Sequence, residues 1–230
     1  KVIPWGRSFD EYVRMFALTD TDLHASILDC AGGPASFNAT MHDRSLQVVS
    51  CDPIYQFSAA QIERRIQETY STVIEGVRAS LEDYVWRDIA SPEELGSVRM
   101  AAMQVFLADF DRYGDRYDRG EIDVPRYITG QLPNLPFEDG QFDLALCSHL
   151  LFTYSDLLSE DFHWHSIVEL CRVAREVRIF PILDISGTLS PRFEPISDRL
   201  KRDGHYLEVR SVNYEFQKGG NRLLVVRSPS

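Results

Sequence analysis

Short apolar runs alternate with amphipathic segments along most of the chain, a pattern typical of an α/β sheet whose strands are mostly parallel. The apolar runs predict a first strand that begins at Ser26. Four further strands are predicted at residues 46–51, 127–129, 142–148 and 177–183. Two further runs, 206–212 and 222–227, flank Gly219-Gly220 and predict a C-terminal antiparallel hairpin. The expected architecture is therefore an open, doubly wound sheet with helices on both faces.

Amphipathic segments between these runs predict helices at residues 8–17, 35–42, 162–174 and 191–203. Ser8 is suited to cap the first of these helices, because its hydroxyl can accept a hydrogen bond from a free N–H of the first turn. Gly204 provides a C-terminal stop for the last helix.

Residues 56–120 depart from the alternation of strand and helix. An apolar stripe from Ile62 to Tyr84 predicts a helix that Gly76 divides into two, and Ser91-Pro92 begins another. About 60 residues between two strands exceed an ordinary crossover. We interpret 56–120 as a helical insertion or lid within a single domain, 1–230. The alternative is a helical layer that only covers the sheet.

The composition describes a globular chain, since 230 residues that are 44% apolar can form a core. No apolar run approaches the ~18 residues of a membrane span, and residues 1–5 lack the apolar part of a signal peptide. We therefore expect a cytoplasmic protein with no membrane partner. The net charge of −11 argues against a nucleic-acid partner, because surfaces that follow phosphates are basic.

The four cysteines, Cys30, Cys51, Cys147 and Cys171, form no C-x-x-C pair. Three of them lie at or near predicted strand ends, where a small apolar residue packs well, and we interpret all four as packing residues. The alternative is a zinc ion or a disulfide. No metal site is predicted.

The candidate chemistry centres on the turn after the first strand, Leu28-Asp29-Cys30-Ala31-Gly32-Gly33-Pro34. Its small residues let the backbone approach a ligand, and the following helix offers free N–H groups. Dinucleotide enzymes use a similar turn, but their G-x-G-x-x-G pattern is absent. Asp52 ends the second strand 23 residues after Asp29, close to the ~20 expected for an acid that binds a ribose. Capping or turn formation is the alternative for both acids.

Three features in this order resemble a class I S-adenosylmethionine-dependent methyltransferase: Leu28-Asp29 with Gly33-Pro34, then Asp52-Pro53, then Leu135-Pro136-Phe137 ahead of Phe142-Asp143. The nearest group is one of uncharacterised bacterial proteins. The resemblance implies a Rossmann-like fold, S-adenosyl-L-methionine as cofactor, and methyl transfer to a small-molecule acceptor. It leaves the acceptor and the oligomeric state open.

The resemblance also implies roles for individual residues. Asp29 would anchor the methionine end of the cofactor through its ammonium group or a water, and Asp52 would accept hydrogen bonds from both ribose hydroxyls. The turn would pass under the methionine and ribose. The other expected cofactor contacts are Ala31, Gly32, Gly33, Pro53, Ile54 at the adenine face, Gln131, Leu132 and Ser148.

Departures from the family pattern concern cofactor affinity. Ala31 and Ala35 stand where the family usually has glycines. Alanine adopts only negative φ without strain, so we expect an altered or locally strained turn. Gln131 replaces an acid that accepts a hydrogen bond from the adenine amino group, and an amide oxygen can still accept it. Arg175-Glu176 replaces the usual Pro-Gly-Gly before the fifth strand.

His149, just after the fourth strand, is the candidate catalytic base, because imidazole takes up a proton near neutral pH. The alternative is that it only walls the pocket. Tyr154, His163 and His165 are weaker candidates, and the i, i+2 spacing of the two histidines disfavours a metal site. Tyr12 either closes over the cofactor or packs in the core.

Two other functions stay open. A nicotinamide-dependent oxidoreductase uses the same type of sheet and is disfavoured by the absent G-x-G-x-x-G pattern. A degenerate, non-catalytic module that binds the cofactor or a partner protein would explain the altered turn and the lack of an obvious base.

Overall fold

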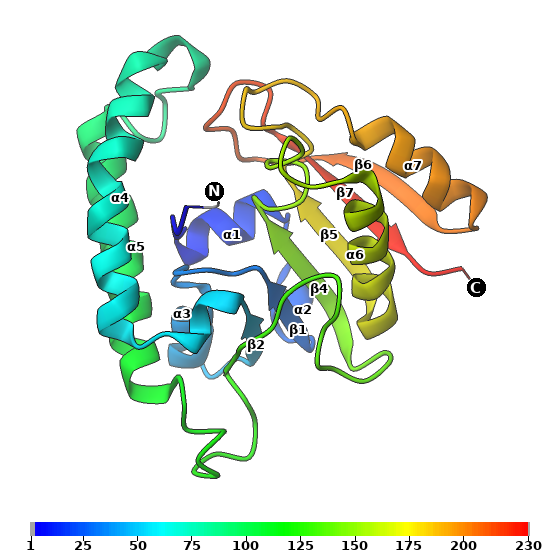
Figure 1. Cartoon of the computed structure of the whole chain (residues 1–230), viewed down its shortest axis with the longest axis horizontal. Coiled ribbons are helices and arrows are strands. Elements are labelled where there is room, and N and C mark those ends of the chain that lie inside the picture. The colour runs from blue at the N-terminus through cyan, green and yellow to red at the C-terminus, as the bar shows by residue number, and fades with distance from the viewer. Residues whose placement is uncertain (1–2, 230) are drawn as a thin grey trace.

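The computed structural model describes residues 3–229 of the chain and is built around a seven-stranded sheet (Figure 1). The strands are β1 (Ile27–Cys30), β2 (Val48–Cys51), β3 (Tyr127–Ile128), β4 (Phe142–Ser148), β5 (Ala174–Phe180), β6 (Tyr206–Ser211) and β7 (Arg222–Arg227). Their order is β3-β2-β1-β4-β5-β7-β6. Strands β1 to β5 are parallel, and β7 runs antiparallel to both β5 and β6. The predicted Rossmann-like sheet with an antiparallel C-terminal hairpin is confirmed.

The order of the strands reverses beside β1, which pairs with β2 on one side and β4 on the other. Ile27 lies opposite both Val48 and Leu144, so the carboxyl ends of the three strands meet at one edge of the sheet. In open α/β sheets a ligand crevice forms at this switch point. The fold thus places the turns after β1, β2 and β4 together.

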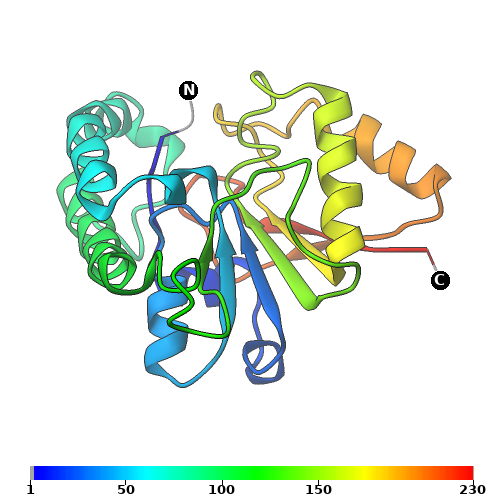
Figure 2. The same cartoon turned by 60° about the horizontal axis from the view of Figure 1, so that its bottom comes forward.

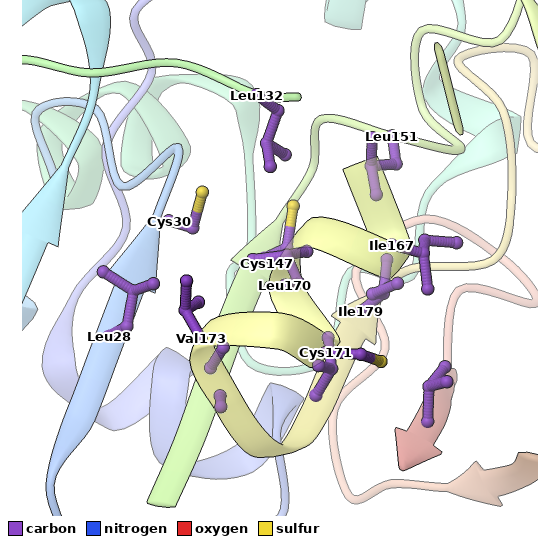
Figure 3. Close-up of a cluster of buried hydrophobic side chains, with 14 of the residues drawn as sticks. Leu28, Cys30, Leu132, Cys147, Leu151, Ile167, Leu170, Cys171, Val173 and Ile179 are labelled. Atoms are coloured by element: carbon purple, nitrogen blue, oxygen red, sulfur yellow. The ribbon is translucent and has the colours of Figure 1, made fainter. Parts of the chain in front are cut away.

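Helices cover both faces of the sheet (Figures 1 and 2). One face packs against α1 (Phe9–Met15) and α3 (Phe37–Asp43), and the other packs against α6 (Glu160–Val173) and α7 (Phe193–Arg202). Alternate strand residues point to opposite faces, so Ile27 joins the α1–α3 core while Leu28 joins the core under α6. Figure 3 shows this second core, in which Leu170 of α6 lies near the sheet.

Two long helices, α4 (Ala59–Ala79) and α5 (Pro92–Tyr113), lie side by side next to the β2–β3 side of the sheet (Figures 1 and 2). Their facing side chains, including Ile66 and Phe106, form a cluster with Tyr55 and Tyr127. Tyr55 follows β2 in the short helix η1 (Pro53–Gln56), and η2 (Leu81–Asp83) follows α4. The helical content predicted for 56–120 is confirmed, and its role as a lid stays a prediction.

The predicted break of α4 near Gly76 is wrong. The helix continues through Gly76, and a Cβ atom built there meets nothing within 4 Å. A solvent-facing glycine lowers the local helix propensity without ending a helix that is held by a buried stripe. Tyr84 lies beyond the helix and forms a bridge to Gln217 near the C-terminal end.

Replacing Gly76 with alanine is expected to stabilise the protein by about 1 kcal/mol, because alanine restricts the unfolded chain and fits the helix without contacts. Gly140→Ala is the matched control, since its site is equally open but its φ is +62°. That change is expected to destabilise the protein, since alanine is strained at positive φ. Urea unfolding measures both changes, and stabilisation by both variants would contradict this account.

Several predicted boundaries are corrected by the structure. β5 begins at Ala174 and ends before Pro181, so the strand predicted at 177–183 lies three residues too far along the chain. The helix predicted at 35–42 begins at Phe37, and a one-turn helix, α2 (Asp20–Leu23), is absent from the predictions. The cap at Ser8 is confirmed by its reciprocal hydrogen bonds with Glu11.

The interpretation of the cysteines as packing residues is confirmed, because all four are buried and unpaired. Cys30 lies in register with Cys51 and with Cys147 across adjacent strands. Within residues 3–229, no cluster of His, Cys, Asp or Glu side chains could hold a metal ion. Each helix in that range is too short or too polar to cross a lipid bilayer.

Candidate active site

A cavity of about 750 Å³ opens at the carboxyl edge of the sheet. One wall consists of the turns after β1 and β2 and the segments after β3 and β4. The rest of the lining comes from α4, α5, the first described residues of the chain and the segment that precedes β7. A volume of this size accommodates a cofactor-sized or drug-sized molecule.

The turn after β1 is locally strained, as the sequence predicts. Ala31 has a φ of +58° and Gly33 a φ of +55°, in the left-handed region that disfavours alanine. The Ala31 N–H donates a hydrogen bond of 2.8 Å to the Cys51 carbonyl, which holds the turn against β2. A Cβ atom at Gly32 would lie 2.2 Å from Oδ2 of Asp29, so glycine is required there.

Asp29 lies beneath this turn and does not line the cavity. It is 1% exposed, and its carboxylate accepts hydrogen bonds from Tyr12 Oη at 3.1 Å and Ser50 Oγ at 3.0 Å. Burial raises its pKa to about 7, although the bonds from Ser50 and Tyr12 act in the opposite direction. Tyr12 lines the cavity, and the contact of Asp29 with a cofactor stays a prediction.

Asp52 faces the cavity from the end of β2. Its Oδ2 accepts a hydrogen bond of 3.0 Å from the Gly33 N–H, and its Oδ1 accepts one of 2.8 Å from the Ile54 N–H. Burial raises its pKa to about 6, opposed by these two bonds. Each carboxylate oxygen keeps a lone pair for a further donor, so the side chain is fixed and ready to bind two hydroxyl groups.

The other expected cofactor residues are brought together by the fold. All of them line the cavity: Ala31, Gly32, Gly33, Pro53, Ile54, Gln131, Leu132 and Ser148. Their side chains differ in accessibility, since Leu132 is buried and Gln131 is exposed. The geometry places these residues at one site, and their contacts with a cofactor stay a prediction.

His149 also lines the cavity, with a φ of +50° at the end of β4. Its Nδ1 lies 2.9 Å from Ser148 Oγ, and its ring packs edge-on against Phe180. Burial, followed by the positive charges of Arg7 and Arg99, lowers the pKa of His149 well below its usual value. The imidazole is therefore neutral at pH 7, and the same effects make it a weaker base than a solvent-exposed histidine.

The weaker catalytic candidates separate in space. Tyr154 lines the cavity, whereas His163 and His165 do not. The ring nitrogens of buried His163 contact the carbonyls of Ser159 and Leu151 at 2.7 and 2.9 Å, a structural arrangement. His165 is exposed on the same helix.

The sequence is 31% identical over 223 residues to the uncharacterised protein MJ0045 of Methanocaldococcus jannaschii, covering 96% of this chain and 94% of the relative. The chain belongs to the MJ0045 family. This relative is archaeal, and the predicted bacterial subgroup stays a prediction. No protein-family model matches the sequence.

Solved structures with similar backbones include S-adenosylmethionine-dependent methyltransferases. Magnesium protoporphyrin IX methyltransferase from Synechocystis, with bound S-adenosylmethionine, has 13% identity and a TM-score of 0.46, covering 96% of this chain and 77% of the other. Mitomycin 7-O-methyltransferase has 13% identity and a TM-score of 0.48, covering 96% and 53%. Because the sequence identities and TM-scores are this low, the fold assignment of this MJ0045-family member rests on its own strand order and register.

A buried ionic cluster beside the cavity of this MJ0045-family member was not predicted. Arg99 of α5, 1% exposed, forms an ion pair with Glu11 of α1, which also accepts a hydrogen bond of 3.0 Å from Tyr214 Oη. Burial would raise the pKa of Glu11, but Arg99 and Arg7 outweigh it and hold the pKa at about 2. The sequence contained one signal for this cluster. Arg99 lies four positions after Leu95, so a charged residue falls on the apolar face of a predicted helix.

Proposed function

We propose that this member of the MJ0045 family is an S-adenosylmethionine-dependent methyltransferase that acts on a small-molecule acceptor. The observation that carries the proposal is Asp52, whose two oxygens are oriented at the cavity wall by the N–H groups of Gly33 and Ile54. A carboxylate in this position is suited to accept hydrogen bonds from both hydroxyls of a ribose.

The residues around Asp52 fit the rest of such a cofactor. Ile54 and Leu132 supply apolar surface for an adenine ring, and Gln131 supplies an amide oxygen for its amino group. The raised pKa values of Asp29 and Asp52 fit a cationic ligand, because a positive charge would stabilise both buried carboxylates. When bound, the cofactor would supply an activated methyl group.

The protein's own contribution would be to orient the acceptor and exclude water. Val73, Val77 and Leu95 of the helical pair give the cavity an apolar lining, which suits a small acceptor. His149 would remove a proton from the acceptor where the reaction requires it. A small molecule also fits the net charge of −11 better than a nucleic acid.

Two alternatives are weighed against this proposal. The dinucleotide fold has the strand order 3-2-1-4-5-6, whereas here antiparallel β7 lies between β5 and β6, which disfavours an oxidoreductase. The strained Ala31 favours a non-catalytic cofactor- or partner-binding module as second candidate. Methyl transfer to an acceptor by the purified chain would exclude that module.

Replacing Asp52 with alanine is expected to weaken S-adenosylhomocysteine binding at least about tenfold, because two charge-assisted hydrogen bonds are lost. Calorimetric titration at pH 7.5 measures the change, with NADH as the ligand control and Asp111→Ala, at an exposed position of α5, as the protein control. Equal affinity of Asp52→Ala and the parent protein would contradict the ribose assignment. Binding of NADH alone would contradict the proposed function.

A further inference from the structure

Arg7 lies at the cavity wall with its positive charge unmatched. Within residues 3–229, no carboxylate lies at ion-pair distance from its guanidinium, which donates one hydrogen bond of 3.0 Å to the Trp5 carbonyl. Its Nε is buried without a hydrogen-bond partner, and the Nε of Arg99 is likewise unpaired. Both side chains line the cavity. Buried donors of this kind normally have an acceptor.

The neighbouring carboxylate of Glu11 already accepts hydrogen bonds from three residues. Its Oε2 accepts from Arg99 and from the Ser8 N–H, and its Oε1 accepts from Tyr214 Oη. Two guanidinium groups thus face one carboxylate, which leaves a net charge of +1 at this wall. Burial, followed by repulsion from Arg99, lowers the pKa of Arg7. A bound anion would offset this repulsion and pair the free N–H groups.

We propose that Arg7 and Arg99 form an anion subsite for the acceptor, and that the acceptor is an apolar molecule with one carboxylate. This inference rests on the proposed methyltransferase function. A single negative charge matches the net charge of the cluster. Arg99 projects from α5 one turn after Leu95. Arg7 lies beside the turn after β1, where its carbonyl accepts a hydrogen bond of 3.0 Å from the Ser36 N–H.

The surroundings of the two arginines suit the apolar part of such a molecule. Trp5, Tyr214 and Phe216 line the same region and offer aromatic surface. The positive charges of Arg7 and Arg99 both act on His149, which places the candidate base within the field of the same subsite. A molecule held at the arginines therefore lies on the side of the cavity where a proton acceptor is available.

The test uses benzoate as the probe and benzamide as its uncharged control, titrated calorimetrically into the full chain saturated with S-adenosylhomocysteine. Arg7→Gln is expected to weaken benzoate binding at least about tenfold, because a charge-assisted bidentate contact is lost. It is expected to leave S-adenosylhomocysteine affinity unchanged. The control variant is Arg64→Gln, an exposed arginine of α4.

The outcomes separate this inference from the proposed function. Benzoate that binds no better than benzamide, or that binds Arg7→Gln and Arg64→Gln equally, overturns the subsite. A second contrary result is that benzoate competes with S-adenosylhomocysteine, and that Arg7→Gln binds S-adenosylhomocysteine more weakly but methylthioadenosine equally well. This result would assign the arginines to the cofactor carboxylate and would also overturn the acceptor subsite. Arg7-dependent benzoate binding without any S-adenosylhomocysteine binding supports the subsite and contradicts the methyltransferase proposal.

Discussion

Asp29→Asn is expected to stabilise the ligand-free protein more at pH 8 than at pH 5, by about 3 kcal/mol. Burial raises the pKa of Asp29 from 3.8 to about 7 in the folded state. Folding therefore favours the protonated form, and the stability contributed by this group is present below pH 3.8 and lost as the pH rises to about 7. Asparagine does not ionise, so the variant avoids this loss.

Urea unfolding of both proteins at pH 5 and pH 8 measures the effect as a difference of differences, in which other titrating groups cancel. Asp111→Asn, at an exposed position, is the control. An equal gain for Asp29→Asn at both pH values would show that Asp29 titrates normally. A carboxylate that costs stability in this way is typical of a binding site rather than of a packed core.

Arg99→Met is expected to destabilise the protein by about 3 to 5 kcal/mol, because it leaves the Glu11 carboxylate charged and buried without its main partner. The double variant Glu11→Gln with Arg99→Met is expected to recover part of this loss, since both charges are then absent. Tyr214 would keep an acceptor for its hydroxyl in the side-chain amide oxygen that Glu11→Gln introduces.

The same urea titration, with Arg64→Met as an exposed control, measures the coupling between Glu11 and Arg99. A loss below about 1 kcal/mol would be that of a surface ion pair and would contradict the burial of this cluster. The loss of stability caused by Arg99→Met is also expected to shrink as the pH falls from 4.5 towards 2. This interval lies between the usual pKa of a glutamate and the pKa of about 2 that Glu11 has in the folded protein.

Local chemistry made the elements of the fold predictable, because each signal lies within a few neighbouring residues. Ser8 caps α1 by bonds to Glu11 three positions away, and Gly204 adopts a φ of +86° just after α7. The same locality explains the errors. Gly76 resembles a helix break in isolation, but the buried stripe of α4, which includes Ile74 and Val77, holds the helix through it.

The cofactor half of the candidate site was predictable for a related reason. Its residues follow the ends of β1, β2, β3 and β4, and parallel strands bring their carboxyl ends to one edge. The residues predicted from these positions therefore share one cavity. Asp29 is the exception, because the strand turns it beneath Gly32 instead of towards the cavity.

By itself, the sequence determined the sheet, the helix caps and the cluster of residues at the strand ends, since these depend on short-range periodicity and turn chemistry. Only the tertiary structure decided which residues of the helical pair and of the N-terminal segment complete the cavity. Arg99 meets Glu11 across 88 positions and Tyr214 meets Glu11 across 203, so no local pattern links them. Charges so far apart in sequence become partners only when packing removes them from water and leaves each other as the available neighbours.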